Sequence, residues 1–197
     1  MPWDKQFDED AARERAMATF WAKGYKATTM QELLDAMGIQ RGSFYSTFGS
    51  KREILLDSLR RYDEDRLKSF ARLRMEDSAL KSIDKLFRAS IAPRGADAQP
   101  KGCFLVASAS ELAPDDPEVA DIVNRAFRDI EGFLRERIER AKAGREIAQD
   151  LDAEAAAHAL LGMLLGVRVL ARSGASRKTI TAIAEQAMAL LSPNSKR

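Results

Sequence analysis

Apolar residues recur at spacings of three and four along almost the whole chain, and this pattern constrains the fold more than any other feature. The clearest case is a stripe that runs from Val119 through Ile122, Phe127 and Phe133 to Ile138. Such spacing places apolar side chains on one face of a helix, whereas a half-buried strand needs strict alternation, which is missing. We therefore predict an all-α protein with about nine helices.

Composition limits the size of the protein and its partners. The chain has 197 residues, 45% of them hydrophobic and 31% charged, so it can bury a core in one sizeable domain or two small ones. Its 32 basic and 30 acidic residues nearly cancel, so a nucleic-acid partner would have to meet a local basic patch. The longest uncharged apolar run, 159–167, is shorter than the roughly 20 residues of a membrane helix, and the first residues lack a secretory signal. We expect a cytoplasmic protein with no membrane partner.

The chain contains one cysteine, Cys103, and one histidine, His158. These residues cannot form an intramolecular disulfide or supply a zinc site on their own, so we expect no metal and no cofactor. Cys103 begins a predicted helix, where a thiol can act as a redox sensor, but its apolar neighbours 104–106 favour a buried small side chain. An enzyme with Cys103 as nucleophile and His158 or Glu111 as base is disfavoured, because no oxyanion motif accompanies the cysteine. We expect no enzymatic activity.

Capping signals predict two short helices after a longer first helix. Thr28 or Thr29 can cap a helix over 30–37, and Glu32 completes a Thr-x-x-Glu capping box with Thr29. A glycine-containing turn leads to a third helix over 42–48. This is the layout of a helix-turn-helix, in which the second short helix enters the DNA major groove.

The residues of this third helix fit that role. Phe44 and Phe48 are four residues apart and can anchor the helix to a core. The segment 23–52 carries five basic and two acidic residues, a local net charge of +3. Gly42 would let the backbone approach a phosphate closely. The side chains predicted to point outward are Gln40, Arg41, Ser43, Tyr45 and Thr47.

The segments 24–30 and 36–53 closely resemble the DNA-binding domain of TetR-family transcriptional regulators. The shared features are a glycine before the capping threonines, the Gly-Ser-Phe-Tyr at 42–45 and the Phe-x-x-Lys-x-Glu at 48–53. The resemblance implies a three-helix DNA-binding domain over 1–50 and a helical ligand-binding and dimerisation domain over 51–197. A long helix over 51–75 would link the two domains, and the last two helices would form a homodimer. The later helices are predicted over 79–92, 103–112, from 117 onward, 153–171 and 178–191.

The same resemblance assigns roles to individual residues. Thr28, Thr29, Tyr45 and Lys51 would hold phosphates of double-stranded DNA. Gln40 stands where many family members have a capping serine or threonine, so the start of the recognition helix can shift by one residue. The side chains that would approach bases are Gln40, Arg41, Ser43 and Ser46.

The C-terminal part offers a candidate pocket and a candidate interface. A pocket for a small-molecule effector is expected among the fifth to eighth helices, although core packing remains open for each lining residue. Gly162 and Gly166 lie four residues apart and would allow two helices to approach closely in a dimer, although the interface residues can equally pack within one subunit. The candidate pocket residues are Phe87, Ile91, Cys103, Phe104, Phe127, Met163 and Val167. The candidate interface adds Ile180, Ile183, Ala187 and Leu190 to the two glycines.

These observations predict a DNA-binding transcriptional regulator. We expect a repressor that binds an inverted-repeat operator and is released by a small-molecule effector. Two alternatives remain open: a DNA-binding regulator that responds to no ligand, and a thiol-based redox sensor that acts through Cys103.

Overall fold

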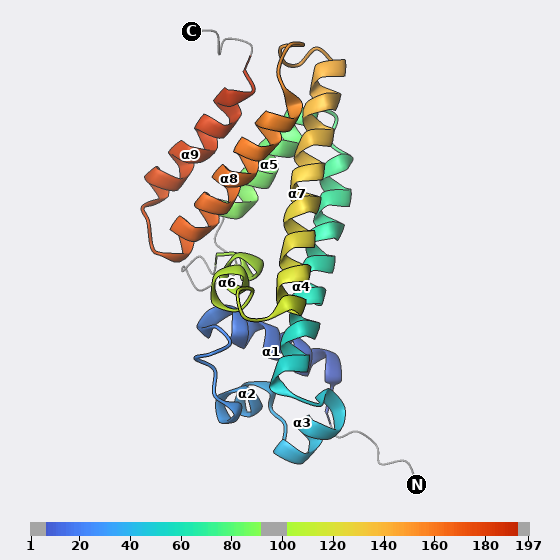
Figure 1. Ribbon diagram of the computed structural model, residues 1–197, viewed down its shortest axis with the longest axis vertical. Helices are drawn as coiled ribbons and strands as arrows, with labels where there is room; N and C mark the ends of the chain where they lie inside the picture. Colours follow the sequence, from blue (N-terminus) through green and yellow to red (C-terminus); the bar gives the residue numbers. More distant parts are fainter. Residues whose placement is uncertain (1–6, 92–101, 193–197) are drawn as a thin grey trace.

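The computed structural model describes residues 7–91 and 102–192, which form nine α-helices and no strand (Figure 1). The predicted all-α fold is confirmed. Helices α1, α2 and α3 lie at one end of the molecule, and the long helices α4 and α7 run together toward the other end, where α5, α8 and α9 pack beside them. The helices are α1 Glu9–Lys23, α2 Met30–Met37, α3 Arg41–Phe48, α4 Lys51–Arg74, α5 Ala79–Ile91, α6 Phe104–Glu111, α7 Pro117–Ala143, α8 Ala153–Arg172 and α9 Arg177–Leu190.

Local sequence signals set the ends of the short helices. Thr29 caps α2, and its side chain and that of Glu32 form the complete predicted capping box. Gly38 ends α2 in the left-handed conformation with φ of 70°, which glycine adopts without steric cost. Gln40 is extended and caps α3 without a side-chain hydrogen bond, so α3 begins at Arg41, one residue earlier than predicted.

Two buried clusters fill the molecule, and α4 contributes to both. Leu55 and Leu59 belong to the cluster under α1–α3, and Phe70 belongs to the cluster at the far end. The Phe70 ring stacks on Phe133 of α7 with 4.4 Å between centroids. The first cluster also includes residues of α6 and of the start of α7, such as Leu105. The DNA-binding end therefore shares one core with helices that follow it by more than 50 residues.

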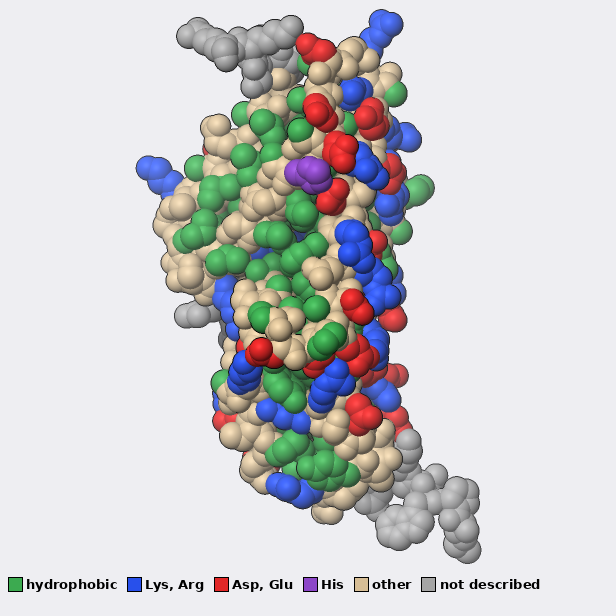
Figure 2. Space-filling model, viewed as in Figure 1, with side chains coloured by type: hydrophobic (Ala, Val, Ile, Leu, Met, Phe, Trp, Pro, Cys, Tyr) green, Lys and Arg blue, Asp and Glu red, His purple; other side chains and the backbone are tan. Residues whose placement is uncertain are grey.

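Helix α8 is longer and more apolar than the uncharged run 159–167 suggested. Over the described part of the chain it is the one helix that could cross a membrane by length and composition, with a mean hydropathy of 1.5. Core helices of globular proteins pass the same test. Here α8 packs on α7 and α9, and apolar side chains gather on the surface over α8 (Figure 2).

Candidate nucleic-acid interface and effector cavity

Helix α3 presents a polar face at the tip of the molecule (Figure 1). Phe44 and Phe48 are buried and hold α3 against the first core, as predicted. The ring of Tyr45 contacts that of Phe44 edge-on, at 5.4 Å between centroids, yet Tyr45 is 47% exposed. Its ring and hydroxyl are therefore accessible to a partner surface. The other side chains of this face are the exposed Gln40, Arg41 and Ser46 and the half-buried Ser43.

Gly42 leaves open space on the same face. A Cβ atom at Gly42 would meet no other atom within 4 Å. The fold itself therefore does not require glycine there. The open space would allow a DNA backbone to approach α3.

The structure corrects the role predicted for Thr28. Its side chain is 1% exposed, and its hydroxyl donates to the carbonyl of Gly24 at 2.6 Å. Thr28 therefore stabilises the turn before α2 and cannot hold a phosphate with its hydroxyl. Thr29 is exposed at the N-terminus of α2, where the helix dipole favours an anion.

Lys51 joins the start of α4 to the turn after α1. Its Nζ donates to the carbonyl of Tyr25 at 2.7 Å and lies 4.2 Å from the centroid of the Tyr25 ring. Burial lowers the pKa of Lys51. One of the three donors of the ammonium is thus occupied, and the others can reach a ligand at the edge of the turn.

Hydrogen bonds from distant helices fix this same turn, and the sequence pattern did not reveal them. The carboxylate of Glu111 in α6 accepts from the backbone N–H groups of Tyr25 at 3.1 Å and Lys26 at 2.7 Å. The carboxylate lies so close to Gly24 that a Cβ there would come within 2.9 Å of Glu111 Oε2. Gly24 has φ of 89°, so it serves both the turn and this close approach.

A second link joins α4 to the start of α7. The Arg52 guanidinium donates to both carboxylate oxygens of Asp116, at 2.8 and 2.9 Å, and to Glu118 at 3.1 Å. Arg52 lowers the pKa of Asp116 through this paired hydrogen bond. Arg52 is one of the five basic residues of the segment 23–52, and the structure places it in this ion pair.

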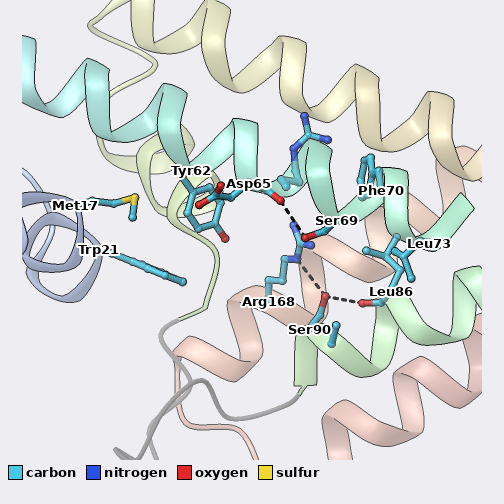
Figure 3. A pocket seen from close by; sticks show the side chains of 12 residues that line it. Met17, Trp21, Tyr62, Asp65, Ser69, Phe70, Leu73, Leu86, Ser90 and Arg168 are labelled. Atoms are coloured by element: carbon cyan, nitrogen blue, oxygen red, sulfur yellow. Dashed lines mark hydrogen bonds between the residues drawn. The ribbon is translucent and has the colours of Figure 1, made fainter. Parts of the chain in front are cut away.

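A cavity of about 210 Å³ lies between the DNA-binding end and the C-terminal helices (Figure 3). Met17 and Trp21 of α1 form one wall. The remaining walls come from α4, α5 and α8. They are lined by Tyr62, Asp65, Arg66, Ser69, Phe70, Leu73, Leu86, Ala89, Ser90 and Arg168.

None of the seven predicted pocket residues lines this cavity. Phe87, Phe104 and Val167 are buried in the core, which is the alternative that the sequence left open for them. Phe127 and Met163 are partly buried and pack against the core. Cys103 and Ile91 line two separate hollows of about 450 and 590 Å³. Helical periodicity identifies an inward face but not whether that face meets side chains or empty space.

Cys103 and His158 lie in different surroundings. Cys103 is buried, and its Sγ lies 3.7 Å from the Tyr62 hydroxyl and 3.5 Å from Nη1 of Arg168. His158 is exposed and lies 3.2 Å from a carboxylate oxygen of Glu131. Within residues 7–91 and 102–192, no cluster of His, Cys, Asp and Glu could hold a metal ion.

The outer face of α8 is open in the single chain. A Cβ at Gly162 or Gly166 would meet nothing within 4 Å. Ile183 and Leu190 are half-buried. Ile180 and Ala187 are buried within the subunit, so these two residues are corrected from interface to core.

The first three helices, with an anchored α3 whose outer face is polar, define a helix-turn-helix DNA-binding protein. The family model of bacterial regulatory proteins of the tetR family matches residues 13–57. The model of the tetracyclin repressor-like C-terminal domain matches residues 79–189. The chain therefore belongs to the TetR family, and it is a DNA-binding transcriptional regulator rather than an enzyme.

Individual relatives agree with this assignment. The HTH-type transcriptional repressor ComR of Escherichia coli K12 is 31% identical over 182 residues, which cover 91% of this chain and 87% of ComR. The uncharacterized regulator YezE of Bacillus subtilis is 30% identical over 171 residues, covering 86% and 88%. A cysteine mutant of the TetR family regulator CifR, in complex with 26-bp operator DNA, is 29% identical with a TM-score of 0.83, covering 94% of this chain and 97% of that one.

Proposed function

We propose that this protein is a cytoplasmic repressor that binds an inverted-repeat operator as a homodimer and leaves it when a small molecule binds. The observation that carries the proposal is the face of α3: two buried phenylalanines hold the helix, while Arg41 and Tyr45 remain exposed. The repressor ComR and the operator complex of CifR support it by similarity. The proposed domains are 1–50 for DNA binding and 51–197 for ligand binding and dimerisation.

Contacts with DNA divide into two groups. The residues that would hold phosphates are Thr29, Tyr45 and Lys51. Thr29 and Lys51 lie at helix N-termini, and Tyr45 is exposed on α3. Phosphate contacts give affinity but little sequence information, whereas side chains at base edges give specificity. Gln40, Arg41, Ser43 and Ser46 would approach base edges in the major groove, with Gly42 beside the DNA backbone.

The open face of α8 would form the dimer together with α9. Gly162 and Gly166 allow close approach of the two-fold related α8 helices, since neither glycine is covered within its own chain. Val169 is half-exposed on the same helix and adds apolar area. A dimer would then present two α3 helices to half-sites spaced by roughly 34 to 36 Å or a larger helical-repeat multiple.

Release by a ligand would act through the turn after α1. Glu111 of α6 binds the backbone of this turn, so a shift of α6 or α8 would move the DNA-binding end. A ligand that binds one arrangement better than the other shifts the population toward it. Cys103 is buried, and this disfavours the redox-sensor alternative because an oxidant must reach the thiol.

Footprinting on the DNA that flanks its own gene tests the proposal. We expect protection of an inverted repeat, with an affinity that falls with salt by a slope of about 0.9 per neutralised phosphate. Arg41→Gln should weaken the specific site more than random DNA, while Arg125→Gln, an exposed control on α7, should bind as the wild type does. Binding that is blind to sequence, or independent of salt, would contradict the proposal.

A further inference from the structure

Arg168 of α8 reaches the cavity between the two ends of the molecule, and its hydrogen-bond partners among the described residues are neutral. Its Nε donates to the hydroxyl of Ser90 at 3.4 Å, and its Nη1 lies 3.5 Å from Sγ of Cys103. Across the described residues, no carboxylate lies within 4.0 Å of this guanidinium, whereas the other arginine that lines the cavity is ion-paired. Arg66, on the opposite wall, is bound to Asp63 and Asp129.

A half-buried guanidinium with long bonds to a hydroxyl and a thiol is incompletely satisfied. Its planar set of donors matches a carboxylate, with which arginine forms two parallel hydrogen bonds. Arg168 lines the cavity, and Figure 3 shows its side chain bonded to Ser90 beside the other lining residues. Among the residues that the structure describes, Arg168 thus brings to the cavity a guanidinium with no carboxylate partner.

The rest of the cavity is largely apolar. Trp21 and Tyr62 stack edge-on at 5.1 Å between centroids, and Phe70, Leu73 and Leu86 continue the wall. The acidic residue among the lining groups, Asp65, is exposed and forms a surface ion pair with Nζ of Lys68 at 2.8 Å. A volume of about 210 Å³ is below the roughly 300 Å³ at which drug-sized pockets begin.

We propose that this cavity binds a small monocarboxylate with an aromatic or short aliphatic body. The carboxylate would pair with Arg168, and the body would lie against Trp21 and Tyr62. The inference rests on the proposed function, because it gives the chemical class of the effector that releases the protein from DNA. It also suggests how binding reaches the DNA: Arg172, one helical turn after Arg168, donates to the carbonyl of Trp21 at 2.8 Å.

Tryptophan fluorescence gives a direct test that needs no DNA. The chain has two tryptophans, so in a Trp3→Phe background Trp21 reports on the cavity alone. Benzoate and hexanoate are titrated against the neutral isosteres benzamide and hexanamide. We expect both acids to change Trp21 emission and to raise the melting temperature, and both amides to do so at least about tenfold more weakly.

Substitutions at Arg168 then assign the charge. Arg168→Gln should weaken acid binding by about tenfold or more and remove the preference over amides, while Arg168→Lys keeps the charge and should retain part of it. Arg125→Gln is the matched control and should change nothing. Circular dichroism confirms that each variant folds, and the lysine variant carries the test if the glutamine variant does not fold.

The outcomes separate this inference from the proposed function. Equal binding of acids and amides, no binding of either, or an acid preference that is undiminished in both Arg168 variants would overturn the carboxylate site. If the acids bind at Arg168 but leave operator affinity unchanged, the carboxylate site stands and release by this ligand fails. If a neutral compound releases the operator and the acids do not bind, release stands and the carboxylate site fails.

Discussion

The guanidinium of Arg172 donates to the backbone carbonyl of Trp21 at 2.8 Å and so ties the end of α8 to the end of α1. A second donation, to the carbonyl of Ala22 at 3.4 Å, involves the same guanidinium. Carbonyls in the last turn of a helix have no partner within the helix, and a cation there also favours the helix dipole. This contact spans about 150 residues of sequence and joins the C-terminal helices to the DNA-binding end.

Removal of this contact should loosen α1. Arg172→Gln is expected to lower the free energy of unfolding by about 1 kcal/mol and to speed amide exchange in the turn after α1. Hydrogen–deuterium exchange with mass spectrometry measures this, with Arg177→Gln at the exposed start of α9 as control. Unchanged exchange over residues 20–28 would show that the contact has no role in holding the turn.

Tyr45 and Phe44 should give opposite results although they are neighbours. Tyr45→Phe removes an exposed hydroxyl, so we expect an operator affinity about tenfold lower and an unchanged melting temperature. Phe44→Ala empties a fully buried site and should cost about 3–5 kcal/mol of stability. Fluorescence anisotropy with labelled operator and thermal melts separate the two effects. An unaltered affinity in Tyr45→Phe combined with Arg41→Glu would refute the assigned face of α3.

Gly162 tests the dimer face. Since a Cβ at Gly162 meets nothing within the chain, Gly162→Leu should fold and even gain helix propensity, yet block close approach of two α8 helices. Light scattering after gel filtration should report a monomer or a weakened dimer. Gly132→Leu is the matched control on α7, where a Cβ is equally unobstructed, and should stay dimeric. If Gly162→Leu and Gly132→Leu formed equally stable dimers, the dimer interface would not include the face of α8 at Gly162.

Glu32 should make stability depend on pH in the acid range. A hydrogen bond from Lys23, with further ones from Thr29, lowers the pKa of Glu32 from 4.5 to about 2. Because the folded pKa is the lower one, the stabilisation is complete above about pH 4.5 and disappears as the pH falls toward 2.

The measurement compares melting temperatures of the wild type and Glu32→Gln from pH 6 down to about 2. We expect a difference at pH 6 that shrinks through the window between the two pKa values. Lys23→Gln removes the main cause and should shift the window upward. A difference that stays constant with pH would show that the ion pair does not contribute.

Salt dependence distinguishes phosphate contacts from base contacts. Lys51→Gln should weaken binding to all sequences alike and reduce the salt slope by about 1, whereas Arg41→Gln should relax specificity by about 1–3 kcal/mol. Titrations of operator and scrambled DNA at several salt concentrations provide both numbers. If Lys51→Gln lost specificity and Arg41→Gln did not, Lys51 would be the base contact and Arg41 the phosphate contact.

The sequence predicted the parts of the fold that local interactions determine. The Thr29 capping box and the buried pair Phe44 and Phe48 depend on residues three or four positions apart, and the structure confirms them. The start of α3 differs by one residue because Gln40 caps it without a side-chain bond, which leaves no signal in the sequence.

Features that depend on distant contacts could not be predicted in this way. Thr28 is buried by a turn that Glu111 holds from 85 residues away, and Arg52 pairs with Asp116 across 64 residues. Ile180 and Ala187 have the same spacing as residues of a dimer face, but here they face their own subunit. The spacing of apolar residues predicts which face of a helix is apolar, but it does not predict which element of the protein packs against that face.

The first buried cluster unites α1–α3 with α6 and the beginning of α7. A fragment that stops at residue 50 would lack Leu105 and Leu112, which belong to the same buried cluster as Phe20 and Leu33. To give this regulator the DNA specificity of a relative, only the outward-facing residues of α3 should therefore be exchanged. Exchange of the whole domain 1–50 would disrupt a hydrophobic core that it shares with α6 and α7.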